Sequence, residues 1–370
     1  MKTNRKNEII LFFIWLLIQF FILFFNGIIS GGEAEKYINE ANLIINQQPL
    51  SSPVYFMYLI EILLVFIKIK FSLSFAFIVI IHLILNALAL FRFQQFLKKS
   101  FNSDKWAFWG SLLLLLCIPY QTYNSLIYTE SIFFSLTILF SCFLLSIEQF
   151  KLKELTKITL FLIILCLTRP TGIYFVMASF LYVFSKTTKG TPVYIKTAAL
   201  IIIPSIILFT LNLMMKNGKG VDVLRPFIQE HIICDVPTIK NSNQIAIQSN
   251  PGLLNLFEYI FNRPLQFIRL GILKTVAFFG LIRPYYSIQH NIYLGLYFYG
   301  IYALILLGII KRNLKIKNEN IFYISLSGIF WLFVIFSCDE WHSRFFLTLT
   351  PFLILMSLRS LYELKNKTLV

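Results

Sequence analysis

Two carboxylates lie two residues apart directly after the first long apolar run, in the segment Gly31-Gly32-Glu33-Ala34-Glu35. A carboxylate in such a loop can act as a general base that takes a proton from a hydroxyl or an amine and makes it a nucleophile. The two acids could instead only favour the start of a following helix, where negative charge interacts well with the helix dipole. Glu33 and Glu35 are therefore the candidate catalytic residues, and the sequence leaves open which of them is the base.

One arginine stands at a helix-breaking position inside a long apolar stretch, in the segment Thr168-Arg169-Pro170-Thr171-Gly172. Proline and glycine interrupt a helix, and an ionisable side chain inside a membrane indicates a functional site. A guanidinium can hold a phosphate through two parallel hydrogen bonds. Arg169 is therefore a candidate phosphate ligand at the apex of two short helices. The alternative is a single tilted span from which Arg169 reaches the membrane surface.

Four ionisable residues lie close together late in the chain, at Asp339, Glu340, His342 and Arg344. Arg344 stands at the edge of the next apolar run, so it is a second candidate phosphate ligand, and His342 is expected to support it. The two basic side chains could instead only pair with Asp339 and Glu340. This segment is the second expected contribution to a donor-binding site.

Three further residues complete the candidate cavity. Glu130 could contact an acceptor or a metal, although stabilisation of the following helix by its negative charge explains it equally well. Tyr37 and Tyr128 are the aromatic residues expected on the acceptor side of the cavity. In a separate apolar run, His82 and Asn86 lie four residues apart and are expected to hydrogen-bond to a neighbouring helix.

The composition places all of these residues in a membrane protein. Of 370 residues, 58% are hydrophobic and 17% are aromatic, which lies far outside the range of soluble domains. The formal charge of +16 could suggest nucleic acid, but the basic residues gather in short breaks between apolar runs, at 2–6, 92–105, 151–157, 186–196, 311–317 and 365–367. The positive-inside rule describes cytoplasmic loops in this way, so we expect no nucleic-acid partner and an active face on the outer side.

Ten apolar runs fit membrane spans, given that about 20 residues cross the hydrocarbon as a helix. The runs are 9–29, 73–91, 106–123, 131–147, 158–167, 173–184, 197–215, 292–310, 321–337 and 345–361. The sequence therefore predicts an all-α polytopic membrane protein with about ten transmembrane helices, in which residues 1–370 form a single membrane domain. Both termini are expected on the cytoplasmic side, and the first run is expected to be a retained signal anchor.

The first outer, or periplasmic, loop is expected to span residues 30–72 and to contain interfacial helices. Within it, residues 54–70 are apolar but carry Glu61, Lys68 and Lys70. A charged residue at the centre of a membrane helix costs about 3 kcal/mol on insertion scales. An amphipathic helix at the membrane surface is therefore preferred to a span.

A larger periplasmic loop is expected at residues 216–291, with interfacial helices that form a lid. Of the five cysteines, only Cys234 and Cys338 fall on the expected outer face, where a disulfide between them could form. The cysteine spacings do not match a metal site. No metal ligand is therefore assigned from the sequence.

Taken in order, these segments resemble the GT-C class of membrane glycosyltransferases, which includes the protein O-mannosyltransferases and the bacterial aminoarabinose transferase. The resemblance covers the whole chain, and its carriers are the acidic loop at 31–38, the Pro-Val-Tyr-Phe-Met-Tyr-Leu run at 53–59, the break at 168–172, and His-Ser-Arg-Phe-Phe at 342–346 with Pro351. The family usually has an Asp in its first outer loop, where this chain has Gly-Gly-Glu-Ala-Glu. A GT-C-like architecture is therefore the expected fold.

The resemblance implies a polyprenyl-phosphate-linked sugar as donor and a glycan, lipid or protein as acceptor, within a bacterial inner (cytoplasmic) membrane and with the active site facing the periplasm. It also implies an inverting displacement in which Glu33 or Glu35 is the base while Arg169 and Arg344 stabilise the departing phosphate. Some relatives use a divalent cation, so one could lie beside the two glutamates, and no other cofactor is expected.

Two other functions remain open at this point. A transporter or flippase for lipid-linked saccharides would use the same cationic cavity without bond chemistry, although such proteins more often carry internal repeats. An oligosaccharide polymerase or ligase would use arginines on the large outer loop, here Arg225, Arg263, Arg269 and Arg283.

Overall fold

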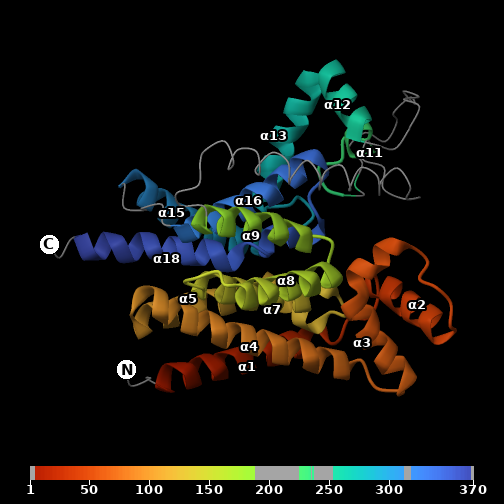
Figure 1. The fold of residues 1–370 in the computed structure, drawn as a ribbon, viewed down its shortest axis with the longest axis horizontal. Coiled ribbons are helices and arrows are strands. Elements are labelled where there is room, and N and C mark those ends of the chain that lie inside the picture. The colour runs from red at the N-terminus through yellow and green to blue at the C-terminus, as the bar shows by residue number, and fades with distance from the viewer. Residues whose placement is uncertain (1–4, 188–224, 235, 237–252, 312–317, 368–370) are drawn as a thin grey trace. The chain divides into compact units, whose positions relative to one another are not determined.

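Helices form the regular structure of the chain in the computed structural model, which describes residues 5–187, 225–234, 236, 253–311 and 318–367. The helices fall into two units, each of which combines segments that are distant in sequence (Figure 1). Unit 1 holds Met1–Ser179, Gly300–Glu319 and Leu347–Val370, and unit 2 holds Phe180–Tyr299 and Asn320–Phe346. The all-α class expected from the sequence is confirmed for the described residues.

The helices of unit 1 begin with the long α1 and end with the late helix α18. In chain order they are α1 (Arg5–Asn26), α2 (Ala34–Ile45), the 3-10 helix η1 (Pro53–Tyr58), α3 (Leu59–Lys70), α4 (Ala76–Phe101), α5 (Asp104–Leu116), α6 (Ile118–Thr122), the 3-10 helix η2 (Tyr123–Ser125), α7 (Thr129–Ser146), α8 (Leu152–Thr168), the first half of α9 (Gly172–Thr187), α15 (Gly300–Ile310) and α18 (Thr350–Lys367).

Unit 2 contains the second half of α9 and most of the helices that follow it. They are α11 (Arg225–Ile228), α12 (Leu253–Asn262), α13 (Pro264–Gly280), α14 (Ile288–Leu294), the π-helical turn η3 (Gly295–Tyr299), most of α16 (Asn318–Phe336), the 3-10 turn η4 (Trp341–Ser343) and most of α17 (Arg344–Leu347).

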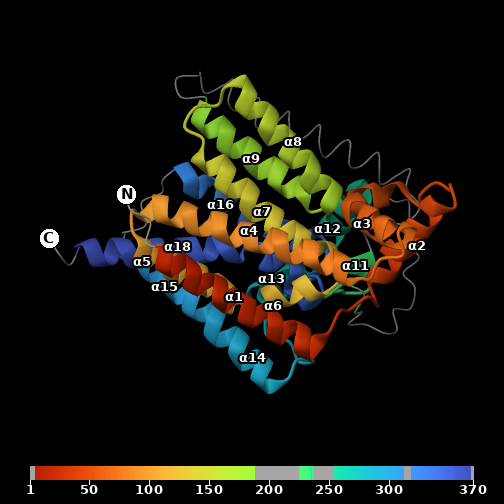
Figure 2. The ribbon, with the colours of Figure 1, turned by 90° about the horizontal axis from the view of Figure 1, so that it is seen from below.

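The core of unit 1 lies between helices that run side by side. α4 packs against α7 and α5, and α7 packs against α8, as the views of Figures 1 and 2 both show. α18 packs against α15 and α5. The closest approach is at Gly110 of α5, where an added Cβ would lie 2.5 Å from Leu97 and 2.7 Å from Leu358. A glycine at this point therefore lets α4, α5 and α18 meet.

Four helices in the described part of the chain are long and apolar enough to cross a membrane, and a bent pair raises the number to five. They are Lys6–Asn26, Ala76–Phe101, Thr129–Ser146 and Ile288–Ile310, with the pair Trp341–Leu347 and Thr350–Lys365. The chain is thus a multi-pass membrane protein by helix length and composition. The prediction of about ten spans is wrong for these residues, while the run at 197–215 lies outside them.

Helix breaks and short helices explain the smaller number of spans. The run 106–123 is not one helix, because α5 ends at Leu116 and a new helix, α6, begins at Ile118. Pro119, which has no N–H to donate, is the second residue of α6. α8 and α9 have 17 and 16 residues, or about 25 Å each, against roughly 30 Å of hydrocarbon. The apolar part of α16, Asn320–Phe336, is similarly short, and the last run bends by 52° between α17 and α18.

The segment 30–72 contains the helices α2 and α3 and no membrane span, as the sequence predicted. The two helices pack against each other and against α4. Their contact is a small apolar core that consists of Ala34, Tyr37, Ala41, Ile62, Val65, Ile78, Val79 and Ile127. The first loop is therefore folded onto the helices of unit 1. Whether α2 and α3 lie in a membrane interface stays a prediction.

Polar side chains inside the apolar helices find partners on neighbouring helices. Asn86 accepts a hydrogen bond from the Trp15 indole at 2.8 Å. The Nε2 atom of His82 lies 3.3 Å from the Glu61 carboxylate, and both side chains are fully buried. The prediction for His82 and Asn86 is confirmed. Glu61 differs from the expectation of a surface helix, since it faces inward and not toward the membrane surface.

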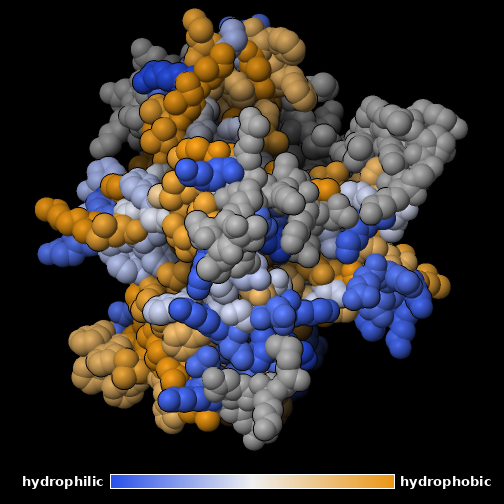
Figure 3. Space-filling model, turned by 90° about the vertical axis from the view of Figure 1, so that its left-hand side faces the viewer, coloured by the Kyte–Doolittle hydropathy of each residue, from blue (hydrophilic) through white to orange (hydrophobic). Residues whose placement is uncertain are grey.

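The two ends of unit 1 carry different polar residues. The end of α4, the start of α5 and the start of α8 carry the basic segments 92–105 and 151–157. Figure 3 looks at this end, and hydrophilic side chains gather in the lower half of the view beside exposed apolar surface. Glu33 and Glu130 stand at the other end, at the starts of α2 and α7. Glu33 and Glu130 thus lie at the opposite end of unit 1 from these basic segments, and the assignment of the two ends to the two sides of a membrane stays a prediction.

Unit 2 contains a disulfide between Cys234 and Cys338, the pair that the sequence left open. Main-chain hydrogen bonds flank it, because the N–H of Cys234 donates to Asp339 at 2.8 Å and the N–H of Asp339 donates to Ile232 at 2.9 Å. Farther along, Phe227 of α11 packs with buried residues of α12 and α13, namely Leu256, Tyr259 and Leu270. The large loop 216–291 is thus partly helical in the residues that are described.

We expect the replacement Cys338→Ser to lower the free energy of unfolding by about 2–4 kcal/mol, because the bond closes a loop between residues 104 positions apart. Thermal unfolding of the purified protein with and without reductant measures the effect. The replacement Cys142→Ser is the control, since that cysteine is free and its loss should leave the sensitivity to reductant unchanged. Alkylation of five thiols in the unreduced protein would contradict the bond.

Candidate functional site

The loop after α1 is tied to the loop before α7 by the main chain. The N–H of Ile29 donates to the carbonyl of Ser125 at 3.0 Å, and the N–H of Ile127 donates to the carbonyl of Ile29 at 3.0 Å. The two bonds form a short parallel bridge between Ile29 and Leu126. Two segments that are far apart in sequence are thereby held together, so that the acidic loop begins beside the start of α7.

Tyr128 closes this junction. Its hydroxyl donates to the carbonyl of Gly31 at 3.3 Å and accepts from the N–H of Glu33 at 3.3 Å. Gly32 between them has φ +63°, and a Cβ there would lie 3.0 Å from the Tyr128 oxygen. Only glycine can adopt this positive φ and leave room for the Tyr128 hydroxyl without strain. Tyr128, expected as a cavity residue, therefore also holds the backbone of the acidic loop.

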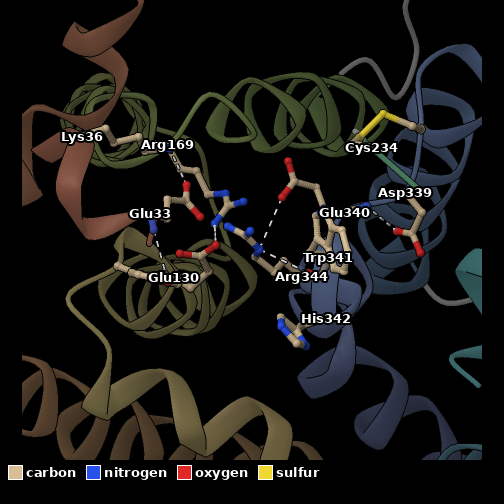
Figure 4. A network of polar contacts seen from close by, with 12 residues as sticks. Glu33, Lys36, Glu130, Arg169, Cys234, Asp339, Glu340, Trp341, His342 and Arg344 are labelled. Atoms are coloured by element: carbon tan, nitrogen blue, oxygen red, sulfur yellow. Dashed lines mark hydrogen bonds and ion pairs between the residues drawn. A yellow bond between two sulfur atoms is a disulfide. The ribbon is translucent and has the colours of Figure 1, made fainter. Parts of the chain in front are cut away.

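Glu33 stands at the start of α2 with its carboxylate half-buried. Its Oε1 atom accepts from the ammonium of Lys36 and from the hydroxyl of Tyr37, the latter at 3.2 Å. Figure 4 shows Glu33 beside Lys36 on one side of unit 1. Glu35 lies in the first turn of α2 and is exposed. The geometry distinguishes two acids that the sequence could not: Glu33 belongs to the cluster, and Glu35 fits the helix-dipole alternative.

Tyr37 links Glu33 to the start of α7. Its side chain is fully buried in the apolar core that also contains Ile127, and its hydroxyl donates to Glu33. Burial raises the pKa of Tyr37 well above its usual value, and the negative charges of Glu33 and Glu130 raise it further. The phenol is therefore a stable hydrogen-bond donor at neutral pH.

Glu130 and Arg169 form a buried ion pair at the centre of the cluster. The Glu130 side chain has no exposed surface and that of Arg169 is 8% exposed. The sequence offered a helix-dipole role for Glu130, and its place in the first turn of α7 agrees with that role. The pair with Arg169 is a second and stronger role, because each buried charge needs a partner of opposite sign.

The break between α8 and α9 sets the position of Arg169. α8 ends at Thr168, Arg169 is extended with φ −158° and ψ 143°, and α9 begins at Gly172. A Cβ at Gly172 would lie 2.6 Å from the main-chain carbonyl of Leu165, so the chain turns back on itself closely at this glycine. The predicted break is confirmed, and a single tilted helix is excluded.

The other predicted ligands belong to unit 2. Arg344 lies 3.3 Å from the Glu340 carboxylate and donates to the carbonyl of Trp341, so it has the pairing that the sequence gave as its alternative. His342 Nδ1 lies 3.4 Å from the hydroxyl of Tyr286. Figure 4 shows Arg344, Glu340 and His342 around the same turn. Five of the predicted residues thus come together in unit 1, while Arg344 and His342 belong to unit 2.

Two charged residues of unit 2, Arg283 and Lys274, make buried contacts that the sequence did not predict. Arg283 forms a buried ion pair with Asp339, and burial raises the pKa of that carboxyl to about 6 despite the opposing charge of Arg283. Lys274 is fully buried, donates to the carbonyls of Ile335 and Ser337, and lies 4.0 Å from the centre of the Phe227 ring. The sequence contains one sign that Lys274 is buried, because it is the only charged residue in the mostly apolar segment 272–276.

The residues present do not fit the divalent cation that the resemblance allowed. Such an ion needs several oxygen or nitrogen donors around one point. Across the described residues, no group of three or more His, Cys, Asp or Glu side chains could hold a metal. Glu33 is engaged by Lys36 and Tyr37, and Glu130 is engaged by Arg169. No chemical step through a metal follows from this arrangement.

We expect Arg169→Ala to lower the free energy of unfolding by about 3–5 kcal/mol, because it leaves the Glu130 charge buried without its partner. Glu130→Gln should also destabilise unit 1. The double replacement Glu130→Gln with Arg169→Gln removes both charges and should recover part of the loss. Chemical denaturation in detergent measures the cycle, with exposed Lys153→Ala as the control. Additive losses in the double variant would show that the two charges are not coupled.

We expect the free energy of unfolding to depend on pH through Lys274, because burial lowers the pKa of its ammonium from 10.5 to about 7. Between these values the unfolded chain binds more protons than the folded chain, so stability rises with pH by up to about 1.4 kcal/mol per unit. Below about pH 7 the penalty for burying the charge is complete.

The measurement is the melting temperature of the wild type and of Lys274→Met between pH 6 and 9. The wild type should gain stability relative to the variant as the pH rises above 7. Lys153→Met, at an exposed position, should follow the wild type. Parallel curves for the wild type and Lys274→Met would contradict the lowered pKa.

No known family model, curated protein or solved structure matches the chain. The contacts of Glu33, Tyr37, Tyr128, Glu130 and Arg169 are therefore the basis on which a function can be proposed.

Proposed function

We propose that the chain is a membrane glycosyltransferase of the GT-C type that moves a sugar from a polyprenyl-phosphate donor to an acceptor on the outer face of the membrane. The observation that supports this most is the convergence of three distant segments at one end of unit 1. The loop after α1 supplies Glu33, the start of α7 supplies Glu130, and the α8–α9 break supplies Arg169.

The chemistry of such a donor suits these residues. A phosphate leaving group carries its own negative charge and can depart without a dedicated general acid, since its second pKa is near 6. The enzyme then needs a base for the acceptor and positive charge for the phosphate. A cluster with one half-buried carboxylate, one accessible ammonium and one guanidinium contains these groups.

Glu33 is the proposed base. It combines partial exposure with fixed contacts to Lys36 and Tyr37, so an acceptor hydroxyl or amine could reach a carboxylate whose position is set. Glu35 is exposed on the first turn of α2, and none of the interactions described for the cluster includes it. In the proposed step the acceptor oxygen or nitrogen loses its proton to Glu33 and bonds to the anomeric carbon as the bond to phosphate breaks, with inversion.

Positive charge for the phosphate comes from two sources in unit 1. The Lys36 side chain is 29% exposed and its ammonium pairs with Glu33, so it can meet a negatively charged donor directly. Arg169 is neutralised by Glu130, so a donor phosphate must compete with that carboxylate for the guanidinium. Arg344 and His342 of unit 2 remain proposed phosphate ligands.

The location follows from the same reasoning. The four to five candidate spans support a multi-pass membrane protein, and the basic end of unit 1 is proposed to face the cytoplasm. The acidic cluster at the opposite end would then face the periplasm of a bacterial inner membrane. The acceptor is a glycan, a lipid or a protein that approaches from that side.

We expect purified wild-type protein to transfer radiolabelled sugar from a polyprenyl-phosphate donor, and Glu33→Gln to lower kcat by at least about 100-fold, because general-base catalysis contributes 10²–10⁴-fold. The matched control is Glu35→Gln, which removes the same charge two residues away and should stay within about threefold of the wild type. Donor binding and the melting temperature of both variants are measured in parallel.

Other results would change the proposal. Full activity in Glu33→Gln, with loss in Glu35→Gln, would move the base to the exposed acid. Donor binding by the wild type without transfer to any of a panel of acceptors would support a transporter of lipid-linked saccharides instead.

A further inference from the structure

A cavity of about 740 Å³ lies between α4, α7 and α8 of unit 1, and the candidate active site does not include it. This volume is within the range of ligand cavities in proteins, about 300–1,000 Å³. The residues that line it come from the last turns of α4, the last turns of α7 and the middle of α8. They are Arg92, Gln95, Phe96, Lys99, Leu139, Cys142, Phe143, Ser146, Lys157, Leu160, Phe161 and Ile164.

The lining has two chemical parts. Three basic residues, Arg92, Lys99 and Lys157, are exposed at the rim. The remaining wall is mostly apolar and aromatic, and no acidic residue belongs to the described lining. Outside the lining, Glu154 pairs with Lys157 at 3.1 Å in α8. The cavity therefore combines three basic residues with a mostly apolar wall, part of which, at Leu160 and Ile164, is also exposed.

The position of the cavity matches the boundary of a membrane. α7 is a candidate span of 18 residues, about 27 Å long. It begins at Thr129, beside the acidic cluster, and ends at Ser146, in the lining of the cavity. The cavity and the candidate active site therefore lie at opposite ends of one membrane helix. The rim lies at the basic end of unit 1, where hydrophilic residues gather in the view of Figure 3.

We propose that this cavity binds an anionic phospholipid of the cytoplasmic leaflet, with the phosphate at Arg92, Lys99 and Lys157 and acyl chain against the apolar wall. Basic pockets between transmembrane helices on the cytoplasmic side bind anionic head groups in this way. Charge complementarity selects a lipid with net negative charge over a zwitterionic one. The apolar wall, which includes Phe96 and Leu160, excludes a free phosphate as the natural occupant.

The test is binding of phosphatidylglycerol to the purified full-length protein, measured by native mass spectrometry and by the shift in melting temperature, with phosphatidylcholine of the same acyl chains for comparison. Phosphatidylglycerol should bind at least about tenfold more tightly than phosphatidylcholine. The triple variant Arg92→Gln, Lys99→Gln, Lys157→Gln should lose at least about tenfold in affinity. The preference should also weaken in high salt.

The matched control is the triple variant Lys105→Gln, Lys151→Gln, Lys153→Gln, which removes three exposed positive charges from the same end without touching the cavity. It should bind phosphatidylglycerol like the wild type. Leu139→Trp keeps every charge and fills the interior, so it should weaken binding as well. Because these measurements read lipid binding and not sugar transfer, their result is independent of the proposed enzyme activity.

Five results would overturn the proposal. Three are equal binding of phosphatidylcholine, equal loss of affinity in the two triple variants, and unchanged binding in Leu139→Trp. The fourth is displacement of phosphatidylglycerol by an equimolar amount of polyprenyl phosphate, which would identify the carrier lipid as the occupant. The fifth is competition by glycerol phosphate without acyl chains, which should fail to compete and would otherwise show a simple anion site.

Discussion

An arginine buried among apolar helices must have a negative partner, because the loss of hydration costs several kcal/mol for each unpaired ion. In unit 1 that partner is Glu130, and the ion pair joins the start of α7 to the break between α8 and α9. Neither residue can move toward solvent without breaking the pair. The pair therefore links two elements of unit 1 that are distant in sequence, and both of its charges also act on the hydroxyl of Tyr37.

Other polar contacts extend the same constraint toward α1. Gln19 donates to Gln121 at 3.0 Å and accepts from Asn124 at 3.2 Å, and Asn124 in turn accepts from Ser131 at 2.7 Å. These side chains are buried and neutral, so they fix helix positions without the cost of charge. Together with the main-chain bridge at Ile29, they connect the first span to the start of α7.

The sequence predicted the local features of the site better than its global arrangement. The acidic loop, the break around Pro170 and the pairing of Cys234 with Cys338 could all be proposed from residue types. The number of spans could not, because a run of apolar residues does not report where a helix ends. The run 106–123 shows this directly, since it contains two helices, α5 and α6.

The sequence could not show which of Glu33 and Glu35 belongs to the cluster. That depends on which side of α2 faces the protein, and the packing of α2 against α3 and α4 determines this side. Similarly, the partners of Glu130 and Lys274 lie far away in sequence, and no local pattern connects them.

The packing of α5 has a consequence for how this protein is made. The rings of Phe101 and Trp106 lie 5.4 and 6.0 Å from that of Tyr362 in α18, and Gly110 contacts Leu358 of the same helix. During synthesis, α4 and α5 are made long before α18 exists. Their orientation can be set early by the basic break between them, whereas their final packing must wait for the last helix. A defect in α18 would therefore affect the assembly of helices near the other end of the chain.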